Sequence, residues 1–270
     1  MSAVLSRIAA ASGAAAGSGV GTVLGTVSRS ATGVGGDVSS LVSQPRLAAA
    51  ASSRLTPQEC ARLDRLRHPE DRASYLAAHI LVRECAAELI GCDPADLALV
   101  QHCDGCGGDD HGRPALCGTP TAAPHVDQHG GRRFGRSLDG SLRESEAPSV
   151  GGAEVRVSLS HTRGYAAAIA SLRDCGIDVE GGGGSIPRGV LTATEADWLR
   201  AQQDQRAAFT QLWTRKESLI KAGLGSLDRA HQLDALHPPG GVELHDWAPA
   251  AATPAAEPRA AAVRGAWCLA

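Results

Sequence analysis

Apolar residues recur at helical or alternating spacing over most of the chain after residue 52, and this spacing predicts a mixture of helices and strands. Pro69 separates two helical patterns, and the second, from about 70 to 90, ends at Gly91. Alternating apolar residues elsewhere predict strands. The predicted elements are helices before Pro69 and at 70–90, 191–203 and 206–222, and strands at 97–101, 154–160, 165–171, 176–180, 227–236, 242–247 and 262–269.

Two segments lack a lasting period. Residues 1–52 are rich in Ala, Gly, Ser and Val and carry few charges, which predicts a disordered extension. Residues 117–152 contain Pro, Gly, His and Ser without periodicity, which predicts a flexible loop or insertion. The folded part of the chain is therefore expected to begin near residue 53.

Composition narrows the class of protein. The chain has 270 residues, enough for one large domain or two of ordinary size. A charged fraction of 20% and a net charge of −3 argue against a protein that binds nucleic acid through bulk positive charge. No apolar run is long enough to span a bilayer, and Gly and Ser interrupt the Ala-rich N-terminal stretch, which argues against a secretory signal. The eight Cys are scattered along the chain and do not suggest a disulfide framework, so we expect the protein to reside in a reducing cytoplasm.

Two carboxylates stand at alternate positions of the predicted strand 176–180. Because successive side chains of a strand face opposite ways, Ile177 and Val179 are expected to pack inward while Asp178 and Glu180 point together to the other face. Carboxylates this close repel one another unless water solvates them or a cation neutralises them. A hard divalent ion such as Mg²⁺ suits this role, and a solvated polar strand face is the alternative.

The predicted helix 206–222 carries charged residues on an apolar face. Trp213, Glu217, Ile220 and Lys221 lie at helical spacing and share that face. The simplest interpretation is an ordinary surface pair between Glu217 and Lys221, which contributes only about 0.3 kcal/mol. A site that needs both a carboxylate and a cation is the alternative.

Ser160 and His161 follow directly on an apolar strand. A lone His is most often structural or solvated. A hydroxyl and an imidazole N–H at a strand end can also donate hydrogen bonds to a phosphate oxygen, so both interpretations stand on the residues alone.

Three blocks of sequence together resemble a known family. They are 157–162 (Val-Ser-Leu-Ser-His-Thr), 176–180 (Gly-Ile-Asp-Val-Glu) and 213–222 (Trp-Thr-Arg-Lys-Glu-Ser-Leu-Ile-Lys-Ala). In this order they are similar to the signature blocks of the 4′-phosphopantetheinyl transferase family, in particular its larger, monomeric, Sfp-type branch. The resemblance spans about 55–230 and does not include residues 1–52.

The resemblance implies an α+β fold. It consists of two similar subdomains related by a pseudo-two-fold axis, with the active site in the cleft between them. The N-terminal subdomain would comprise 53–157, including the loop at 117–152. The C-terminal subdomain would comprise 158–270 and carry the metal-binding and catalytic motifs.

The resemblance also implies an activity. Enzymes of this family transfer the 4′-phosphopantetheine group of coenzyme A to a serine of an apo acyl or peptidyl carrier protein and release adenosine 3′,5′-bisphosphate. Asp178, Glu180 and Glu217 would hold Mg²⁺, or Mn²⁺ in its place. Glu217, Lys221 and His161 would be the catalytic residues, with Glu217 taking the serine proton directly or through a metal-bound water. The carrier would belong to fatty-acid, polyketide or nonribosomal peptide synthesis.

A set of contacts to coenzyme A follows from the same resemblance. The residues expected to make them are Gly112, Arg113, Pro114, Ser160, His161, Lys216, Lys221 and Arg72. Gly112 to Pro114 resembles a turn that lies against the adenine. Ser74 stands where the family often has Arg, so Arg72, or a basic residue at 65–67, is expected to contact the 3′-phosphate. Glu195 matches a further acidic position that would assist the metal or the base.

A Cys-rich turn has two interpretations. Cys103-x-x-Cys106 with His111, and with Cys117 or His102, has ligands that suit structural zinc, although the spacing of the second pair is irregular. Free thiols beside the nucleotide are the favoured interpretation. A thioredoxin-type redox pair is disfavoured because no strand-to-helix context follows it.

Two other classes of protein remain as alternatives. One is a Mg²⁺-dependent phosphohydrolase of coenzyme A or another nucleotide, which would use the same carboxylates without a carrier. The other is a zinc-binding interaction protein organised on the Cys-rich turn. The favoured prediction is a monomeric, cytoplasmic transferase that binds coenzyme A and carrier proteins, and neither nucleic acid nor membrane.

Overall fold

The computed structural model describes residues 52–103, 106–108, 112–118, 147–182, 189–247 and 263–270, together with the backbone of two strands at 22–28 and 31–37. Its helices are α4 (Pro57–Arg65), α5 (Pro69–Ile90), α6 (Ala193–Arg200) and α7 (Gln205–Lys221), with 3₁₀ turns η1 (Pro94–Asp96) and η2 (Leu227–Gln232). Its strands are β1 (Thr22–Ser28), β2 (Ala31–Asp37), β3 (Leu97–His102), β4 (Arg113–Gly118), β5 (Ser149–Val150), β6 (Ala153–Glu154), β7 (Arg156–Thr162), β8 (Tyr165–Ser171), β9 (Cys175–Glu180), β10 (Glu243–Trp247) and β11 (Arg264–Leu269). The predicted mixture of helices and strands is confirmed.

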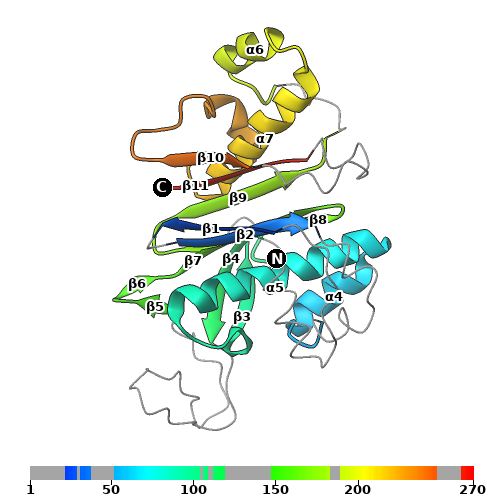
Figure 1. Cartoon of the computed structure of the whole chain (residues 1–270), viewed down its shortest axis with the longest axis vertical. Coiled ribbons are helices and arrows are strands. Elements are labelled where there is room, and N and C mark those ends of the chain that lie inside the picture. Colours follow the sequence, from blue (N-terminus) through cyan, green and yellow to red (C-terminus); the bar gives the residue numbers. More distant parts are fainter. Residues whose placement is uncertain are drawn as a thin grey trace.

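The elements form layers (Figure 1). An antiparallel sheet has the strand order β1-β2-β8-β7, and a second has the order β10-β11-β9. Helix α5 packs on the four-stranded sheet, the three-stranded sheet lies beyond that sheet, and α7 covers the outer side of the three-stranded sheet. Two short pairs, β3–β4 and β5–β6, complete the described strands.

Helix α5 is buried along most of its length. Pro69 opens it, and Gly91 ends it in the left-handed conformation at φ 79°, as the sequence predicts. Residues 73–87 are buried without interruption, so α5 carries no broad solvent face there. A helix buried on all sides needs partners for its polar residues, and Glu59 of α4 supplies one for His79 and Arg83.

Small side chains allow β8 to pack on both faces. Residues 166–170 are fully buried. Ala166, Ala168 and Ala170 contribute to the core with α5, while Ala167 and Ile169 pack against β9. The alternation of a strand thus sends successive residues into two different cores.

Strand β9 divides its side chains between two layers. Ile177 and Val179 pack toward β8, and the intervening acidic residues face α7. Gly176 lets α7 approach closely, because a Cβ at this position would lie 1.8 Å from the carbonyl oxygen of Ser218. This close approach places the last turns of α7 directly over β9.

Three local predictions differ from the structure. Strands β1 and β2 lie within the predicted disordered extension, and β2 pairs with the edge of β8, a partner more than 100 residues away. The segment predicted as a strand at 227–236 begins with the 3₁₀ turn η2, and β4 was not predicted. Each of these elements depends on pairing with another segment or on local backbone hydrogen bonds, and the spacing of apolar residues reports neither.

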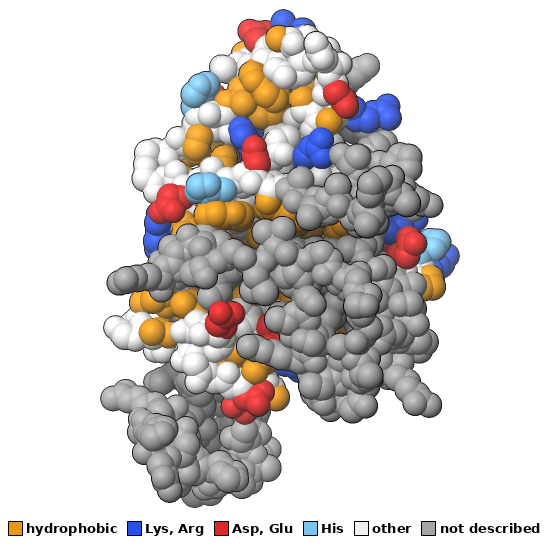
Figure 2. Space-filling view, in the orientation of Figure 1, with side chains coloured by type: hydrophobic (Ala, Val, Ile, Leu, Met, Phe, Trp, Pro, Cys, Tyr) orange, Lys and Arg blue, Asp and Glu red, His pale blue; other side chains and the backbone are white. Residues whose placement is uncertain are grey.

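The predicted division into two subdomains stays a prediction. Its boundary between 157 and 158 would fall within β7. Most of the predicted loop 117–152 lies outside the described residues, and its two ends contribute to β4 and to β5. None of the described helices is long and apolar enough to cross a membrane. On the face shown in Figure 2, acidic and basic side chains are interspersed over the part that the structure describes.

Candidate functional site

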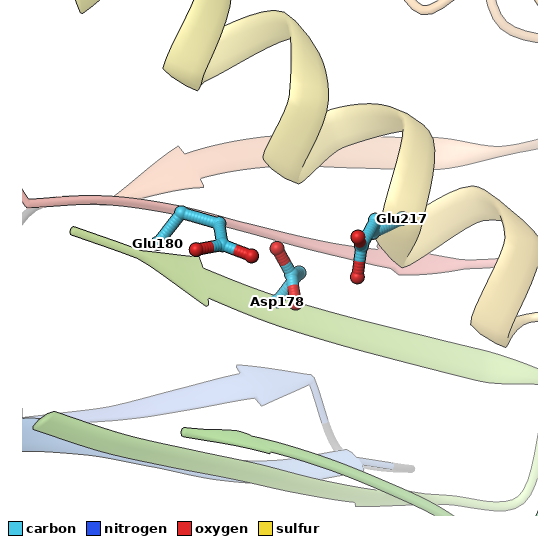
Figure 3. Close-up of side chains that lie close together, drawn as sticks. All are labelled: Asp178, Glu180 and Glu217. Atoms are coloured by element: carbon cyan, nitrogen blue, oxygen red, sulfur yellow. The ribbon is translucent and has the colours of Figure 1, made fainter. Parts of the chain in front are cut away.

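Three carboxylates converge between β9 and α7 (Figure 3). Asp178 and Glu180 project from the same face of β9, and Glu217 reaches toward them from α7. One carboxylate oxygen of each lies within 4.8 Å of the others. In the described part of the chain this is the one group of three or more His, Cys, Asp or Glu side chains arranged to share a metal ion. The alternation predicted for β9 and the helical spacing predicted for α7 are both confirmed here.

Asp178 is the buried centre of the group, with 1% of its surface exposed. Its Oδ1 accepts hydrogen bonds from Ser160 Oγ at 2.8 Å and from Lys221 Nζ at 2.6 Å. Its Oδ2 is buried and has no hydrogen-bond partner among the described residues. A buried carboxylate oxygen without a donor is costly, and a metal ion at this position would satisfy it.

The negative charges of the three carboxylates are only partly neutralised by neighbouring residues. Burial and the charges of Asp178 and Glu217 raise the pKa of Glu180 to about 7. Burial and the charge of Asp178 likewise raise the pKa of Glu217 to about 7, against the lowering effect of Lys221 and of a hydrogen bond with Trp213. Three carboxylates with one ammonium group therefore fit a divalent cation bound by oxygen ligands.

Lys221 lies at the edge of this group. Its Nζ donates to Asp178 and to the carbonyl oxygen of Ile177 at 3.3 Å, and lies 3.7 Å from Glu217 Oε2. About 30% of its side chain is exposed. The ammonium group can thus contact both the carboxylates and an anion that arrives from solvent.

The predicted Gly-Arg-Pro turn lies beside the end of α7. Arg113 Nη2 donates to the carbonyl oxygen of Lys221 at 3.4 Å and lies against Gly223. Gly112 has φ 107°, and a Cβ there would collide with the carbonyl of His102. Arg113 therefore lies beside the end of the helix that carries Glu217 and Lys221, and the contact of this turn with adenine stays a prediction.

Lys216 has its partners within the protein. It is fully buried, and its Nζ lies 2.7 Å from Glu195 Oε2. It also donates to the carbonyl oxygens of Ala230 and Leu233. Lys216 and Glu195 are therefore buried partners of one another, and the contact of Lys216 with coenzyme A and the role of Glu195 at the metal or the base stay predictions.

Ser160 and Arg72 also have structural partners. The Ser160 hydroxyl donates to Asp178 and accepts from the Val179 N–H at 3.3 Å, so it orients a metal ligand and does not point to solvent. The Arg72 guanidinium donates to the Leu63 carbonyl oxygen at 2.6 Å and joins α4 to α5. Both side chains therefore have contacts within the protein, and their predicted contacts to coenzyme A stay predictions.

Ser74 has a role of its own. Its hydroxyl donates to the Glu70 carbonyl oxygen at 2.7 Å and accepts from the Gly164 N–H at 2.9 Å. This links α5 to the turn between β7 and β8, next to His161. The position is fully buried and leaves no room for an arginine.

A pocket of about 330 Å³ opens between α4, α5 and β3. Arg62 and His102 bring basic groups to its lining, and Tyr75, Leu99 and Gln101 contribute apolar and amide surface. The sequence interpretation placed Tyr75 in the core pattern of α5 and did not single out Arg62. The pocket is assembled from three segments, so no single stretch of sequence predicts it.

A buried charged group forms one wall of this pocket. Glu59 pairs with Arg83 Nη2 at 2.7 Å and with His79 Nδ1 at 2.6 Å. Burial raises the pKa of Glu59, but hydrogen bonds from His79 and Arg83 and the charge of Arg83 outweigh it and lower the pKa to about 2. Burial lowers the pKa of His79, and the hydrogen bond with Glu59 and its negative charge oppose this effect. The sequence does contain a signal for this buried group, because His79 and Arg83 stand four residues apart in an otherwise apolar helical segment.

His161 lies between the pocket and the carboxylates. Its ring packs edge-on against Tyr75, with centroids 5.7 Å apart, and Tyr75 stacks on His79. Burial of the imidazole lowers the pKa of His161, and the charges of His79 and Lys221 lower it further, although the residue as a whole is exposed. Through Tyr75, His161 therefore contacts the lining of the pocket.

The Cys-rich turn is only partly described. The Gly107 N–H donates a hydrogen bond to the Cys103 carbonyl oxygen at 2.7 Å, and Cys106 is exposed. His111, the predicted third zinc ligand, lies outside the described residues. The Cys117 thiol donates to the Ala98 carbonyl oxygen within the β3–β4 pair. The zinc hypothesis therefore stays a hypothesis.

Comparison with models of known protein families identifies a match in the C-terminal part of the chain. Residues 174–248 match the family model described as the 4′-phosphopantetheinyl transferase superfamily. The matched segment includes the three converging carboxylates and Lys221, and ends just after β10. No curated protein matches the chain.

Proposed function

We propose that the chain transfers 4′-phosphopantetheine from coenzyme A to a serine of an apo acyl or peptidyl carrier protein, because residues 174–248 match the 4′-phosphopantetheinyl transferase superfamily. Adenosine 3′,5′-bisphosphate is the second product. The observation that carries this proposal is the convergence of Asp178, Glu180 and Glu217 beside Lys221, within the matched segment. This arrangement suits a reaction that breaks a phosphoanhydride bond, because negative charge on both phosphates must be neutralised.

Asp178, Glu180 and Glu217 would hold Mg²⁺, with Mn²⁺ as a substitute. The unpartnered Asp178 Oδ2 and the acidic, oxygen-only ligand set both fit such an ion. When bound, the ion neutralises charge on the pyrophosphate of coenzyme A.

Glu217 is the carboxylate that meets the carrier. About 22% of its side chain is exposed, whereas Asp178 is buried. The serine hydroxyl attacks the phosphorus that bears pantetheine, and its proton passes to Glu217 directly or through water. The bond from this phosphorus to the bridging oxygen breaks, and that oxygen leaves with adenosine 3′,5′-bisphosphate. Lys221 supplies positive charge beside the same phosphates, and His161 can donate to one of them.

The pocket between α4, α5 and β3 takes the nucleotide end of coenzyme A. Its volume of about 330 Å³ is at the small end of the range for ligand sites, so it suits the nucleoside and not the whole cofactor. Arg62 and His102 can bind the 3′-phosphate in place of Arg72. The location of His161 between this pocket and Lys221 supports one ligand that spans both.

The direct test is to incubate the protein with coenzyme A, Mg²⁺ and apo carrier proteins from fatty-acid, polyketide and nonribosomal peptide synthesis. We expect the intact mass of at least one carrier to increase by one phosphopantetheine group, and a carrier whose acceptor serine is replaced by Ala to gain nothing. Hydrolysis of coenzyme A with no mass gain on any carrier would contradict the proposal and favour a phosphohydrolase.

A further inference from the structure

The buried pair Glu195–Lys216 lies apart from the three carboxylates. Both side chains are fully buried, with Lys216 Nζ 2.7 Å from Glu195 Oε2. The proposed reaction uses neither. Burying two charges is costly, so a pair retained at this depth needs a compensating structural or functional role.

Every polar group of the pair is satisfied. The ammonium group of Lys216 reaches Glu195 and the carbonyl oxygens of Ala230 and Leu233, which accounts for its three N–H donors. Glu195 also accepts from the Ala235 N–H at 2.8 Å and from its own helix cap. The pair therefore joins four segments: the start of α6, the middle of α7, the end of η2, and the loop after it.

This network fixes α7 at the residue before Glu217. Consecutive residues of an α-helix point about 100° apart, so Lys216 can enter the buried network while Glu217 faces β9. A helix anchored at position 216 cannot easily rotate or slide. A carboxylate roughly 6 Å from a helix axis moves about 1 Å when the helix rotates by roughly 10°, and a misplacement of about 1 Å is enough to lower a rate about 100-fold.

We propose that Glu195 and Lys216 are positioning residues, which hold Glu217 in place beside Asp178 without touching substrate. The proposal rests on the proposed function for its kinetic test, but it also predicts the affinity of the carboxylates for a metal ion. That second quantity can be measured whether or not the chain modifies a carrier.

The test uses E195Q and K216M, which keep the side-chain shape and remove one charge each. The matched control is D197N on the same helix, which removes a carboxylate from an exposed ion pair with Arg200. Mn²⁺ binding is titrated by electron paramagnetic resonance, and kcat and KM for coenzyme A are measured well below each variant's melting temperature.

We expect E195Q and K216M to bind Mn²⁺ at least fivefold more weakly, and to lose about 10- to 100-fold in kcat with KM for coenzyme A within twofold of wild type. D197N should match wild type in both. If a single variant does not fold, the double variant E195Q/K216M removes both charges, and we expect it to fold and to show the same losses.

Folded E195Q or E195Q/K216M with wild-type Mn²⁺ affinity and kcat would overturn the proposal. So would a K216M variant that changes KM for coenzyme A alone, because this would assign Lys216 to the substrate. A wild-type protein that modifies no carrier would refute the proposed function, while the Mn²⁺ titration would still decide the positioning role.

Discussion

Replacing Gly176 with Ala tests whether the close approach of α7 to β9 creates the site. The added Cβ would lie 1.8 Å from the Ser218 carbonyl oxygen and 2.9 Å from the Ala222 nitrogen, both of them backbone atoms that cannot rotate away. Such contacts essentially never occur below 3.0 Å, so α7 and β9 must separate by about 1.2 Å. Lys221 and Glu217 would then move away from Asp178.

Both stability and activity should fall. Overpacking of this kind costs about 1–3 kcal/mol, which lowers the melting temperature by roughly 3–10 °C in a chain of this size. A separation of about 1 Å between Glu217 and Asp178 should lower kcat about 100-fold and weaken Mn²⁺ binding. Thermal unfolding, Mn²⁺ titration and carrier modification measure the three effects on one preparation.

The control is Gly181→Ala, just after the end of β9. A Cβ there would meet only Thr162 Oγ1 at 3.4 Å, an ordinary contact. This variant should resemble wild type in all three measurements. If Gly176→Ala also retained wild-type melting temperature, Mn²⁺ affinity and kcat, the claim that backbone contact between α7 and β9 sets the geometry of the carboxylates would be refuted.

Three further predictions concern separate parts of the molecule. Asp178→Ala and Glu217→Ala should each lower transfer by at least ~10³-fold while the circular dichroism spectrum stays unchanged, since each removes a ligand of the proposed metal; near-normal transfer by either would exclude the metal assignment. Arg62→Ala should raise KM for coenzyme A about 10-fold and leave KM for 3′-dephospho-coenzyme A unchanged, because a charged hydrogen bond to the 3′-phosphate is lost; equal effects on both substrates would place Arg62 elsewhere. Because the folded-state pKa of Glu59 is lowered from 4.5 to about 2, its ionised form contributes about 3 kcal/mol of stability above pH 4.5, which is lost as pH falls toward 2. Melting curves across this range should therefore show a steep loss of stability in wild type, and the part due to Glu59 should be absent in Glu59→Gln, which is less stable at neutral pH because Arg83 is left buried without its partner.

The predictions that succeeded rest on local geometry. Alternation on a strand was enough to place Asp178 and Glu180 on one face, and helical spacing was enough to place Glu217 and Lys221 together. The Gly at position 91 correctly marked the end of α5, because few residues other than glycine adopt the left-handed conformation at no cost. Short-range rules therefore predicted the elements that carry the carboxylates.

The structural partners that the sequence did not predict lie far away along the chain. Lys216 stands beside Glu217 in the same motif, yet it is bound by Glu195 and by carbonyl groups after η2, and its sequence neighbours give no sign of this. Arg72 donates to the Leu63 carbonyl oxygen near the end of α4, and the Ser74 hydroxyl accepts from the Gly164 N–H in the turn before β8. A basic side chain can bind a phosphate or a buried carbonyl, and only the tertiary structure decides which.

The central claim is that Asp178, Glu180 and Glu217 bind a divalent metal against the pyrophosphate of coenzyme A. A crystal of the protein with coenzyme A and Mn²⁺, measured at a wavelength where manganese scatters anomalously, tests it most directly. We predict a single anomalous peak at coordination distance from all three carboxylates and from oxygens of the pyrophosphate. Coenzyme A bound with manganese elsewhere, or with Glu217 outside the coordination sphere, would contradict the claim.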